Sequence, residues 1–308
     1  MRSIWAGVSS ALLVLWLMTA AWAQNGLERF EKELKPQFEL KTFTYANAAP
    51  LGSSGFVLND VVAVIPGNAA TGDKESTVKI QKVTVEALDF DRMKKDSKDD
   101  EAPRFAKLKL EGITGDDEMF TALQPYGVPN VPFDIALDYT LDPATKVLDV
   151  KTLEIAMRGQ AKFVLALQMD GVSDKTSGMA GAKDDARLRT ASLTVDDTGL
   201  LGKLLPAIAK EQGQTADALA AFALVSISAF CEGQGQATLN ALDALASFVG
   251  DWKAPKGPLV VGLKPSKTTA VSDLDKVLEP NALVDVFGLE VSYPGTRPGA
   301  AKAGPSTK

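Results

Sequence analysis

Strict alternation of apolar and polar positions runs through residues 133–141 and again through residues 161–169. A period of two is the signature of a strand with one apolar and one polar face. The segment between them, residues 148–157, alternates in two halves that are one residue out of step. A single β-bulge at Lys151 and Thr152 would absorb this slip. We therefore predict three antiparallel strands that share one bulge.

The bulge brings the large apolar side chains of all three strands onto one face. Asp142 and Pro143 suit a type I turn between the first two strands. Each cross-strand pair of side chains contributes roughly 0.2–1 kcal/mol to stability. A register that pairs large apolar residues in every row is therefore favoured. The predicted rows are Leu141 with Leu148 and Met169, Tyr139 with Val150 and Leu167, Leu137 with Leu153 and Leu165, Ile135 with Ile155 and Phe163, and Phe133 with Met157.

Further segments extend this sheet on both sides. Apolar spacing in residues 24–35 predicts a short amphipathic helix ahead of the sheet. Residues 77–91 change phase twice, which predicts a bulged or strongly twisted strand in a curved sheet. In all, strands outside the central three are predicted at residues 38–45, 55–65, 77–91, 105–114 and 187–195, separated by clusters of Gly, Pro, Asn and Asp.

Helical periodicity replaces alternation after residue 197. Residues 198–210, 215–230 and 236–249 each place Leu, Ile, Val or Phe on one helical stripe and are predicted to be amphipathic helices. In the second of these helices the predicted stripe contains Leu219, Phe222, Val225 and Phe230. Two more strands are predicted at residues 259–263 and 287–293.

These elements predict an α+β fold in which a large curved antiparallel β-meander is packed by three C-terminal amphipathic helices and a short terminal strand. We expect one domain over residues 24–295, with strands mostly in 24–196 and helices plus two strands in 197–295. Residues 296–308 are small, basic and rich in Pro and Gly, which predicts a disordered tail.

The N-terminus has the pattern of an export signal. Arg2 precedes an apolar run at residues 4–18, and Ala21-Trp22-Ala23 matches the small-x-small cleavage pattern. The apolar run is too short to span a bilayer comfortably. We therefore predict a signal peptide over residues 1–23 and a periplasmic protein with no stable membrane span after cleavage.

Composition narrows the classes of function. The chain has no His and only one Cys, so Ser-His and Cys-His nucleophile pairs, His-ligated metals and an intramolecular disulfide are excluded. The net charge of −6 argues against nucleic acid and anionic membrane surfaces as partners. No cofactor, metal site or catalytic residue is predicted.

Two short fragments match the boxes of serine enzymes that use lysine as a base: Ser76 to Lys79 and Lys175 to Gly178. The first lies at the start of a predicted strand and the second in a predicted loop, where those enzymes have a helix and a strand. The carboxylate pairs Asp184-Asp185 and Asp196-Asp197 lie at loop and helix-start positions, where Asp is favoured anyway. A Ser/Lys or carboxylate hydrolase is therefore the least favoured alternative.

Two strand segments carry a family resemblance. Residues 84–90 read Thr-Val-Glu-Ala-Leu-Asp-Phe and residues 108–113 read Leu-Lys-Leu-Glu-Gly-Ile. With the strand-after-strand layout of residues 38–195, they resemble uncharacterised exported proteins of Gram-negative bacteria whose β-meanders are similar to AsmA-like envelope proteins. The resemblance implies handling or shielding of lipids and transfers no functional residue.

The apolar face of the central strands has two interpretations. Either the helices seal it as an ordinary core, or part of it stays open and binds a lipid or another hydrophobic ligand. The second interpretation predicts a periplasmic, non-enzymatic binding protein, and the alternative is an envelope scaffold that binds another protein. The candidate ligand-binding residues are Phe133, Ile135, Leu137, Tyr139, Ile155, Phe163, Leu165 and Leu167.

Overall fold

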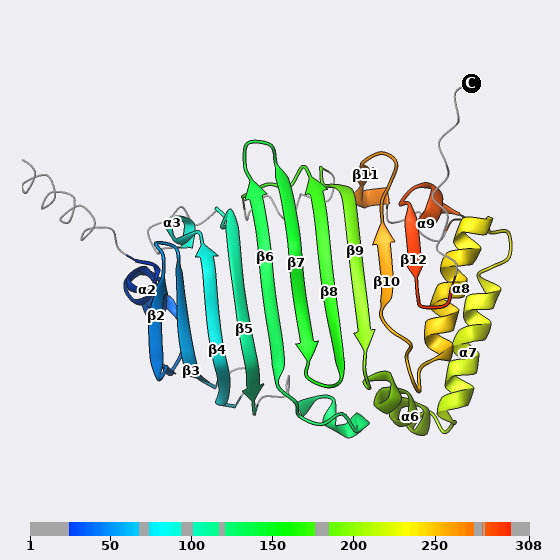
Figure 1. The fold of residues 1–308 in the computed structure, drawn as a ribbon, viewed down its shortest axis with the longest axis horizontal. Coiled ribbons are helices and arrows are strands. Elements are labelled where there is room, and N and C mark those ends of the chain that lie inside the picture. Colours follow the sequence, from blue (N-terminus) through cyan, green and yellow to red (C-terminus); the bar gives the residue numbers. More distant parts are fainter. Residues whose placement is uncertain are drawn as a thin grey trace, which may run out of the picture.

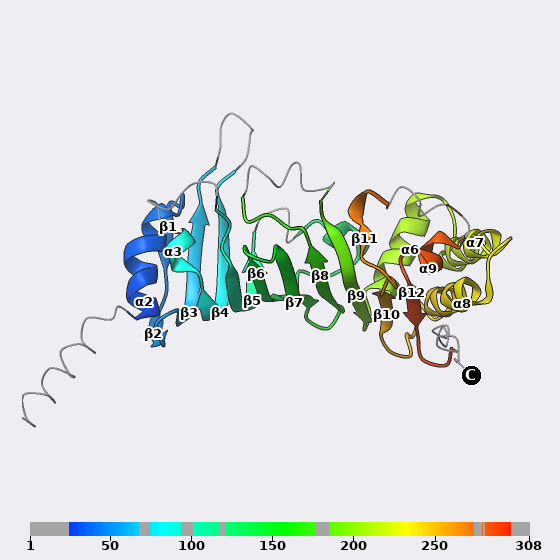
Figure 2. The same cartoon turned by 90° about the horizontal axis from the view of Figure 1, so that it is seen from above.

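One open, antiparallel sheet of twelve strands forms the body of the protein, with helices at its two ends (Figures 1 and 2). The computed structural model describes residues 25–67, 74–93, 101–116, 121–175, 185–273, 279 and 281–296. The predicted α+β class is confirmed. The predicted signal peptide lies outside the described residues, as does the predicted tail after Thr296.

The elements follow the chain from one end of the sheet to the other. The first half contains α2 (Gly26–Arg29), the helical turns η1 (Phe30–Leu34) and η2 (Lys35–Gln37), β1 (Thr42–Thr44), β2 (Asn47–Leu51), β3 (Gly55–Ile65), β4 (Ser76–Leu88), α3 (Phe90–Met93), β5 (Phe105–Gly115) and η3 (Gln124–Tyr126). The second half contains β6 (Phe133–Asp142), β7 (Val147–Met157), β8 (Ala161–Asp170), β9 (Arg187–Asp197), α6 (Leu201–Glu211), α7 (Ala216–Ala229), α8 (Gln236–Gly250), β10 (Leu259–Leu263), β11 (Thr269–Ala270), α9 (Ala282–Asp285) and β12 (Leu289–Ser292).

The strand order is that of a meander. It runs β1-β3-β4-β5-β6-β7-β8-β9-β10-β12, while β2 also pairs with β3 and β11 pairs with β9. Every pairing is antiparallel. The predicted return of a short terminal strand to the sheet is confirmed, because β12 pairs with β10.

The register of β6, β7 and β8 is the one that the alternation predicts. Each predicted row is present, from Leu141 opposite Leu148 to Phe133 opposite Met157. The register shift falls at Lys151 and Thr152, as predicted. In the pairing of β6 with β7 it lies between Asp138 and Tyr139, and in the pairing of β7 with β8 both Lys151 and Thr152 are left without a partner residue. One shared bulge therefore keeps the apolar side chains of three strands on one face.

A second irregularity bends the sheet at β3, β4 and β5. Asp60, Gln81 and Gly112 lie at the same level of these strands, and Asp60 and Gly112 have left-handed φ angles of 53° and 66°. The left-handed φ favours glycine at Gly112, and a Cβ there would also displace the end of the Gln81 side chain. Together with a bulge between Val85 and Ala87, this bend accounts for the phase changes predicted in residues 77–91.

The buried side chains gather in two separate cores, one at each end of the sheet. The N-terminal core joins η1 to β3 and β4, and its centre contains Phe30, Phe56, Leu58 and Phe90. The predicted amphipathic helix of residues 24–35 supplies Phe30 and Leu34 to this core. The C-terminal core joins α8 to β10 and β12 through Ala241, Ala244, Phe248, Leu259 and Val291.

The C-terminal helices stand at the end of the sheet and not over its middle (Figure 1). α8 packs on β10 and β12, and α7 packs on α6 and α8. The predicted buried stripe of α7 is wrong in three of its four residues, because Phe222, Val225 and Phe230 are exposed. Without a sheet beneath it, α7 has only its neighbouring helices to bury apolar surface against. No helix in the described ranges is long and apolar enough to span a membrane.

Candidate functional site

The candidate residues lie together on one face of the central strands. We define the central apolar face as the apolar side chains of β6, β7, β8 and β9 that the cross-strand pairs align. It contains all eight predicted residues, with Leu193 and Val195 added by the pairing of β9 with β8. None of the eight is buried: seven are partly exposed, and Ile155 is 41% exposed. Leu193, beside Leu165, is 37% exposed.

The same face is covered towards the ends of the sheet, where Leu137 and Tyr139 pack against the N-terminal core and Val195 against the C-terminal core. Phe30 and Leu34 of η1 pack against residues of β3 and β4 that are in register with Leu108 and Leu110 of β5. At the other end, α8 packs on Leu259 of β10, which pairs with Val195. Figure 2 shows the helices at these two ends, and the middle of the sheet as a single layer among the described elements. Helices thus flank the central apolar face.

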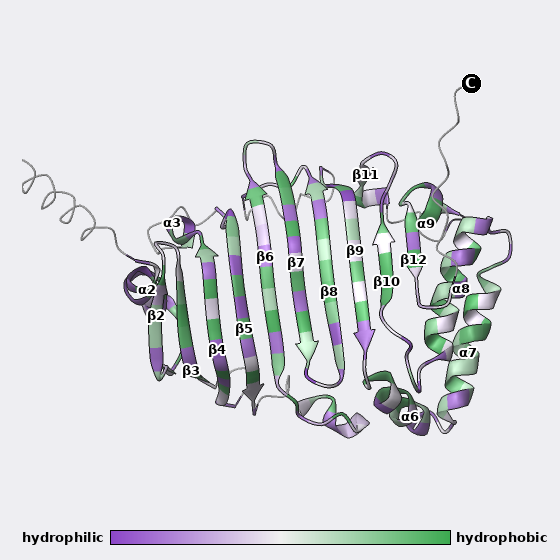
Figure 3. Ribbon diagram, in the orientation of Figure 1, coloured by the Kyte–Doolittle hydropathy of each residue, from purple (hydrophilic) through white to green (hydrophobic). Residues whose placement is uncertain are grey.

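The opposite face of the central strands is polar, and ion pairs link its side chains. Alternation of hydrophilic and hydrophobic residues along these strands is visible in Figure 3. Arg158 donates to both carboxylate oxygens of Asp134, at 2.9 and 2.8 Å, and Gly112 N–H donates to the same carboxylate at 2.7 Å. Burial raises the pKa of Asp134, but these hydrogen bonds outweigh it and hold the pKa below its ordinary value. This face therefore remains an ionised, solvated surface.

The central apolar face carries a single polar side-chain atom among its eight candidate residues. Tyr139 Oη donates to the carbonyl of Pro103 at 3.0 Å, so the hydroxyl is occupied within the protein. Burial and the nearby charge of Asp89 raise the pKa of Tyr139, which keeps the phenol neutral. The face consequently presents hydrocarbon and aromatic surface without a free charge or donor for a polar ligand.

Two connections meet across one end of this face. We call residues 101–104 and 171–175 the strap. The first run leads into β5 and the second follows β8, and β6 and β7 separate these two strands. Glu101 and Lys175 form an antiparallel bridge, and Lys175 Nζ lies 2.9 Å from Glu101 Oε1. Ala102 N–H donates to the carbonyl of Asp174 at 2.7 Å, and Arg92 bonds Asp174 Oδ2 at 2.9 Å. The strap thus closes over the end of the strands near Tyr139.

Asp89 anchors the strap to the N-terminal core. Its side chain is 2% exposed and accepts hydrogen bonds from Nε, Nη2 and backbone N–H of Arg104 at 2.7, 3.0 and 3.0 Å. Burial alone raises the pKa of Asp89, but the Arg104 hydrogen bonds and the charges of Arg104 and Arg92 bring it below the ordinary value. Arg104 in turn accepts at its carbonyl from Leu141 N–H at 2.6 Å.

At the opposite end of the strands, α6 meets the turn between β7 and β8. Asp197 caps α6 by accepting hydrogen bonds from the N–H groups of Gly199, Leu200 and Leu201. Lys203 Nζ donates to Gln160 Oε1 at 2.6 Å, which ties the helix to the turn. η3 contacts α6, so the connection before β6 also lies at this end.

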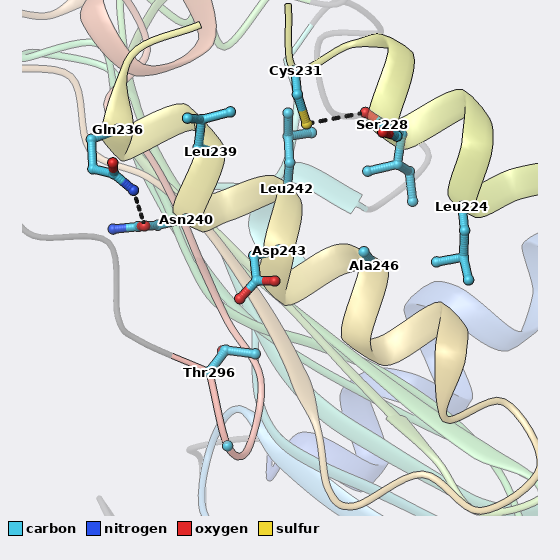
Figure 4. Close-up of a pocket in the computed structure, with 12 residues that line it drawn as sticks. Leu224, Ser228, Cys231, Gln236, Leu239, Asn240, Leu242, Asp243, Ala246 and Thr296 are labelled. Atoms are coloured by element: carbon cyan, nitrogen blue, oxygen red, sulfur yellow. Dashed lines mark hydrogen bonds between the residues drawn. The ribbon is translucent and has the colours of Figure 1, made fainter.

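A separate hollow lies between α7 and α8, away from the central apolar face. It has a volume of about 650 Å³ and is lined by Leu224, Cys231, Leu239, Asp243 and Thr296 among others (Figure 4). Cys231 is a free, partly exposed thiol whose Sγ lies 3.5 Å from the carbonyl of Ile227. Polar and apolar groups alternate around this hollow, and no cluster of charges converges in it.

The structure separates the residues of the hydrolase alternative. Ser76 and Lys79 are three positions apart on regular β4, so their side chains point to opposite faces of the sheet. Lys175 pairs with Glu101, and residues 176–178 of its box lie outside the described ranges. Asp197 is occupied by the amides of α6, and Asp184 also lies outside the described ranges. Among the described residues, no group of acidic or Cys side chains is placed to hold a metal ion.

Comparison with known proteins adds one finding. The sequence pattern of a family described as "Uncharacterized protein" matches residues 145–294, just under half of the chain. That region runs from β7 to β12 and includes three of the four strands of the central apolar face together with α6, α7 and α8. No curated protein matches the chain.

Proposed function

We propose that the protein binds the hydrocarbon part of a lipid, or a similar hydrophobic ligand, on the central apolar face. The observation that carries this proposal is the exposure of Ile155 and Leu193 in the middle of an aligned apolar surface. Soluble proteins seldom leave such a surface uncovered unless something binds there.

The dimensions of the face support a ligand with extended chains. Four neighbouring strands of about ten residues cover roughly 19 Å by 33 Å, or about 600 Å², from standard strand spacing and rise. This area is the footprint of the strands, and the partly exposed side chains present a part of it to solvent. A surface of this width accommodates chains lying side by side, which favours a lipid over a compact aromatic ligand.

The chemistry of the face favours binding over catalysis. A hydrolase needs a nucleophile and a base within hydrogen-bond reach of each other, and the candidate face offers only Tyr139 Oη, which is bonded to Pro103. The proposed protein is therefore a non-enzymatic lipid-binding protein. The export pattern at Arg2 and Ala21-Trp22-Ala23 supports a place in the periplasm, where lipids in transit need shielding from water.

Exchange of Leu165 for Asp tests this function, with Ala166→Asp as the matched control. Leu165 lies on the central apolar face, and Ala166 is the next residue of β8 on the opposite face. Both are partly exposed, so both variants should fold, as circular dichroism would show. We expect Leu165→Asp to weaken binding of fluorescent oleic acid roughly thirtyfold, because about 2 kcal/mol of apolar contact is lost. Ala166→Asp should bind as the native chain does; equal binding by both variants would contradict the proposal.

A protein partner is the second candidate, and the open edges of the sheet favour it. The strand order ends at β1 and at β12, and neither edge is closed against the other. Exposed edges offer backbone donors and acceptors to a strand of another chain. A co-purifying protein that survives exchange of Leu165 for Asp would favour this function.

A further inference from the structure

Helix α7 is apolar all round and exposes one of its sides to solvent. We define the α7 stripe as the exposed apolar residues of this helix and the residue after it. Phe222 is 68% exposed, Val225 65% and Phe230 41%. Figure 3 shows α7 as mostly hydrophobic along its length. The α7 stripe consists of Ala218, Ala221, Phe222, Val225, Ala229 and Phe230.

The other side of α7 already has its partners. Leu224, Ser228 and Cys231 face α8 across the hollow of Figure 4, and α7 packs on both α6 and α8. A helix that is apolar all round is normally buried on every side or placed against lipid. The α7 stripe therefore lacks a covering surface among the described residues.

The charges around the stripe limit the kinds of partner that can bind to it. The fourteen residues from Ala218 to Cys231 contain no charged side chain. Asp217 at one end is paired with Lys253 at 2.7 Å, and Glu232 follows the other end. A partner rich in acidic groups, including an anionic membrane, would be repelled by these acids and by the net charge of −6.

The size of the stripe argues against a second copy of the chain as its occupant. A helix of 14 residues is about 21 Å long and about 10 Å wide, so one face offers roughly 200 Å². Stable protein interfaces bury about 800 Å² on each partner. Membrane binding has no such threshold, because its strength scales with the apolar area that enters the headgroup and acyl boundary.

We propose that the α7 stripe docks the protein on the surface of a zwitterionic phospholipid bilayer, with Phe222 and Val225 entering the headgroup and acyl boundary. This inference goes beyond the proposed function. It requires only α7, and its failure would leave binding on the central apolar face untouched. If both hold, docking would place that face beside a source of lipid.

Flotation with vesicles made only of phosphatidylcholine tests the docking. We expect the native protein to rise with the vesicles and Phe222→Glu and Val225→Glu to partition about tenfold more weakly, as loss of a buried aromatic or branched side chain requires. Because both side chains are at least 65% exposed, these variants should fold normally. Ile65→Glu, at a 40% exposed site of β3, is the matched control and should float as the native chain does.

Three results would overturn the docking. Absence of the native protein from the floated fraction is the first, and equal flotation of native chain and α7 variants is the second. The third is a dimer in light scattering that Phe222→Glu converts to a monomer, since the stripe would then pair two copies. Oleic acid binding, measured in parallel, should be the same for Phe222→Glu and the native chain. It separates a failure of docking from a failure of the lipid site.

Discussion

Asp89 holds one end of the strap through Arg104. A carboxylate that is 2% exposed stays ionised here because Arg104 supplies three hydrogen bonds, two from its guanidinium and one from its backbone. The guanidinium of Arg104 is 42% exposed, so water can solvate it when the pair is broken. The cost of losing Asp89 is thus set mainly by the buried acceptor and by the backbone N–H of Arg104.

The lowered pKa of Asp89 makes part of the stability sensitive to acid. Its folded-state pKa lies below the ordinary value of 3.8, so its contribution is fully present above about pH 4. The contribution is lost as the pH falls through the lowered pKa. We expect Asp89→Asn to lower the free energy of unfolding by about 1–3 kcal/mol at pH 7 and to flatten the decline below pH 4. Urea unfolding at a series of pH values would measure both effects, and an unchanged acid limb would contradict this assignment.

Among the elements, the strap joins strands that are not neighbours. Glu101 lies in the connection before β5 and Lys175 in the connection after β8, and β6 and β7 separate these two strands; yet their backbones pair and their side chains form an ion pair. Arg92 and Asp174 add a second ion pair whose side chains are only 16% and 17% exposed. The strap therefore fixes one end of the central strands against opening.

Reversing one charge of the strap should loosen it, and reversing both should restore it in part. Glu101→Lys places a cation beside both Lys175 and Arg92, whereas adding Lys175→Glu re-forms the first pair in the opposite sense and leaves the repulsion with Arg92. A partly exposed ion pair is worth roughly 0.2–1 kcal/mol, so the Ala102 amide, which donates to Asp174, should exchange up to about fivefold faster in the single variant. Hydrogen exchange would measure this rate. A double variant that exchanges as fast as the single one would show that the ion pair does not hold the strap.

The predictability of each element follows from the range of the interactions that form it. The rows of β6, β7 and β8 could be read from alternation because cross-strand pairs join residues close in sequence. The exposure of α7 could not be predicted from the sequence. Periodicity shows that Phe222 and Val225 share one side of the helix, but it does not show whether another element covers that side. The contacts of the strap could not be predicted either, because Glu101 and Lys175 are ordinary charged loop residues in the sequence and only the topology of the sheet brings them together.

At the scale of the whole molecule, two small cores are joined by a single layer of strands. The N-terminal core centres on Phe30 and Phe56, whose rings stack 4.5 Å apart, and the C-terminal core on Phe248 and Tyr293, 5.5 Å apart. Between them, side chains on both faces of β8 are partly exposed. Leu165 and Leu167 would be buried if helices covered the middle of the sheet. In this protein the buried cores lie at the two ends of the sheet, and the side chains in its middle are partly exposed. That division is what a binding surface on a rigid frame requires.

Native mass spectrometry of the protein purified without detergent, followed by solvent extraction, tests the central claim most directly. We predict a defined lipid-sized mass above that of the polypeptide, absent from Leu165→Asp and retained by Ala166→Asp. A clean polypeptide mass for the native chain, together with no uptake of added oleic acid, would contradict the claim that the central apolar face binds lipid.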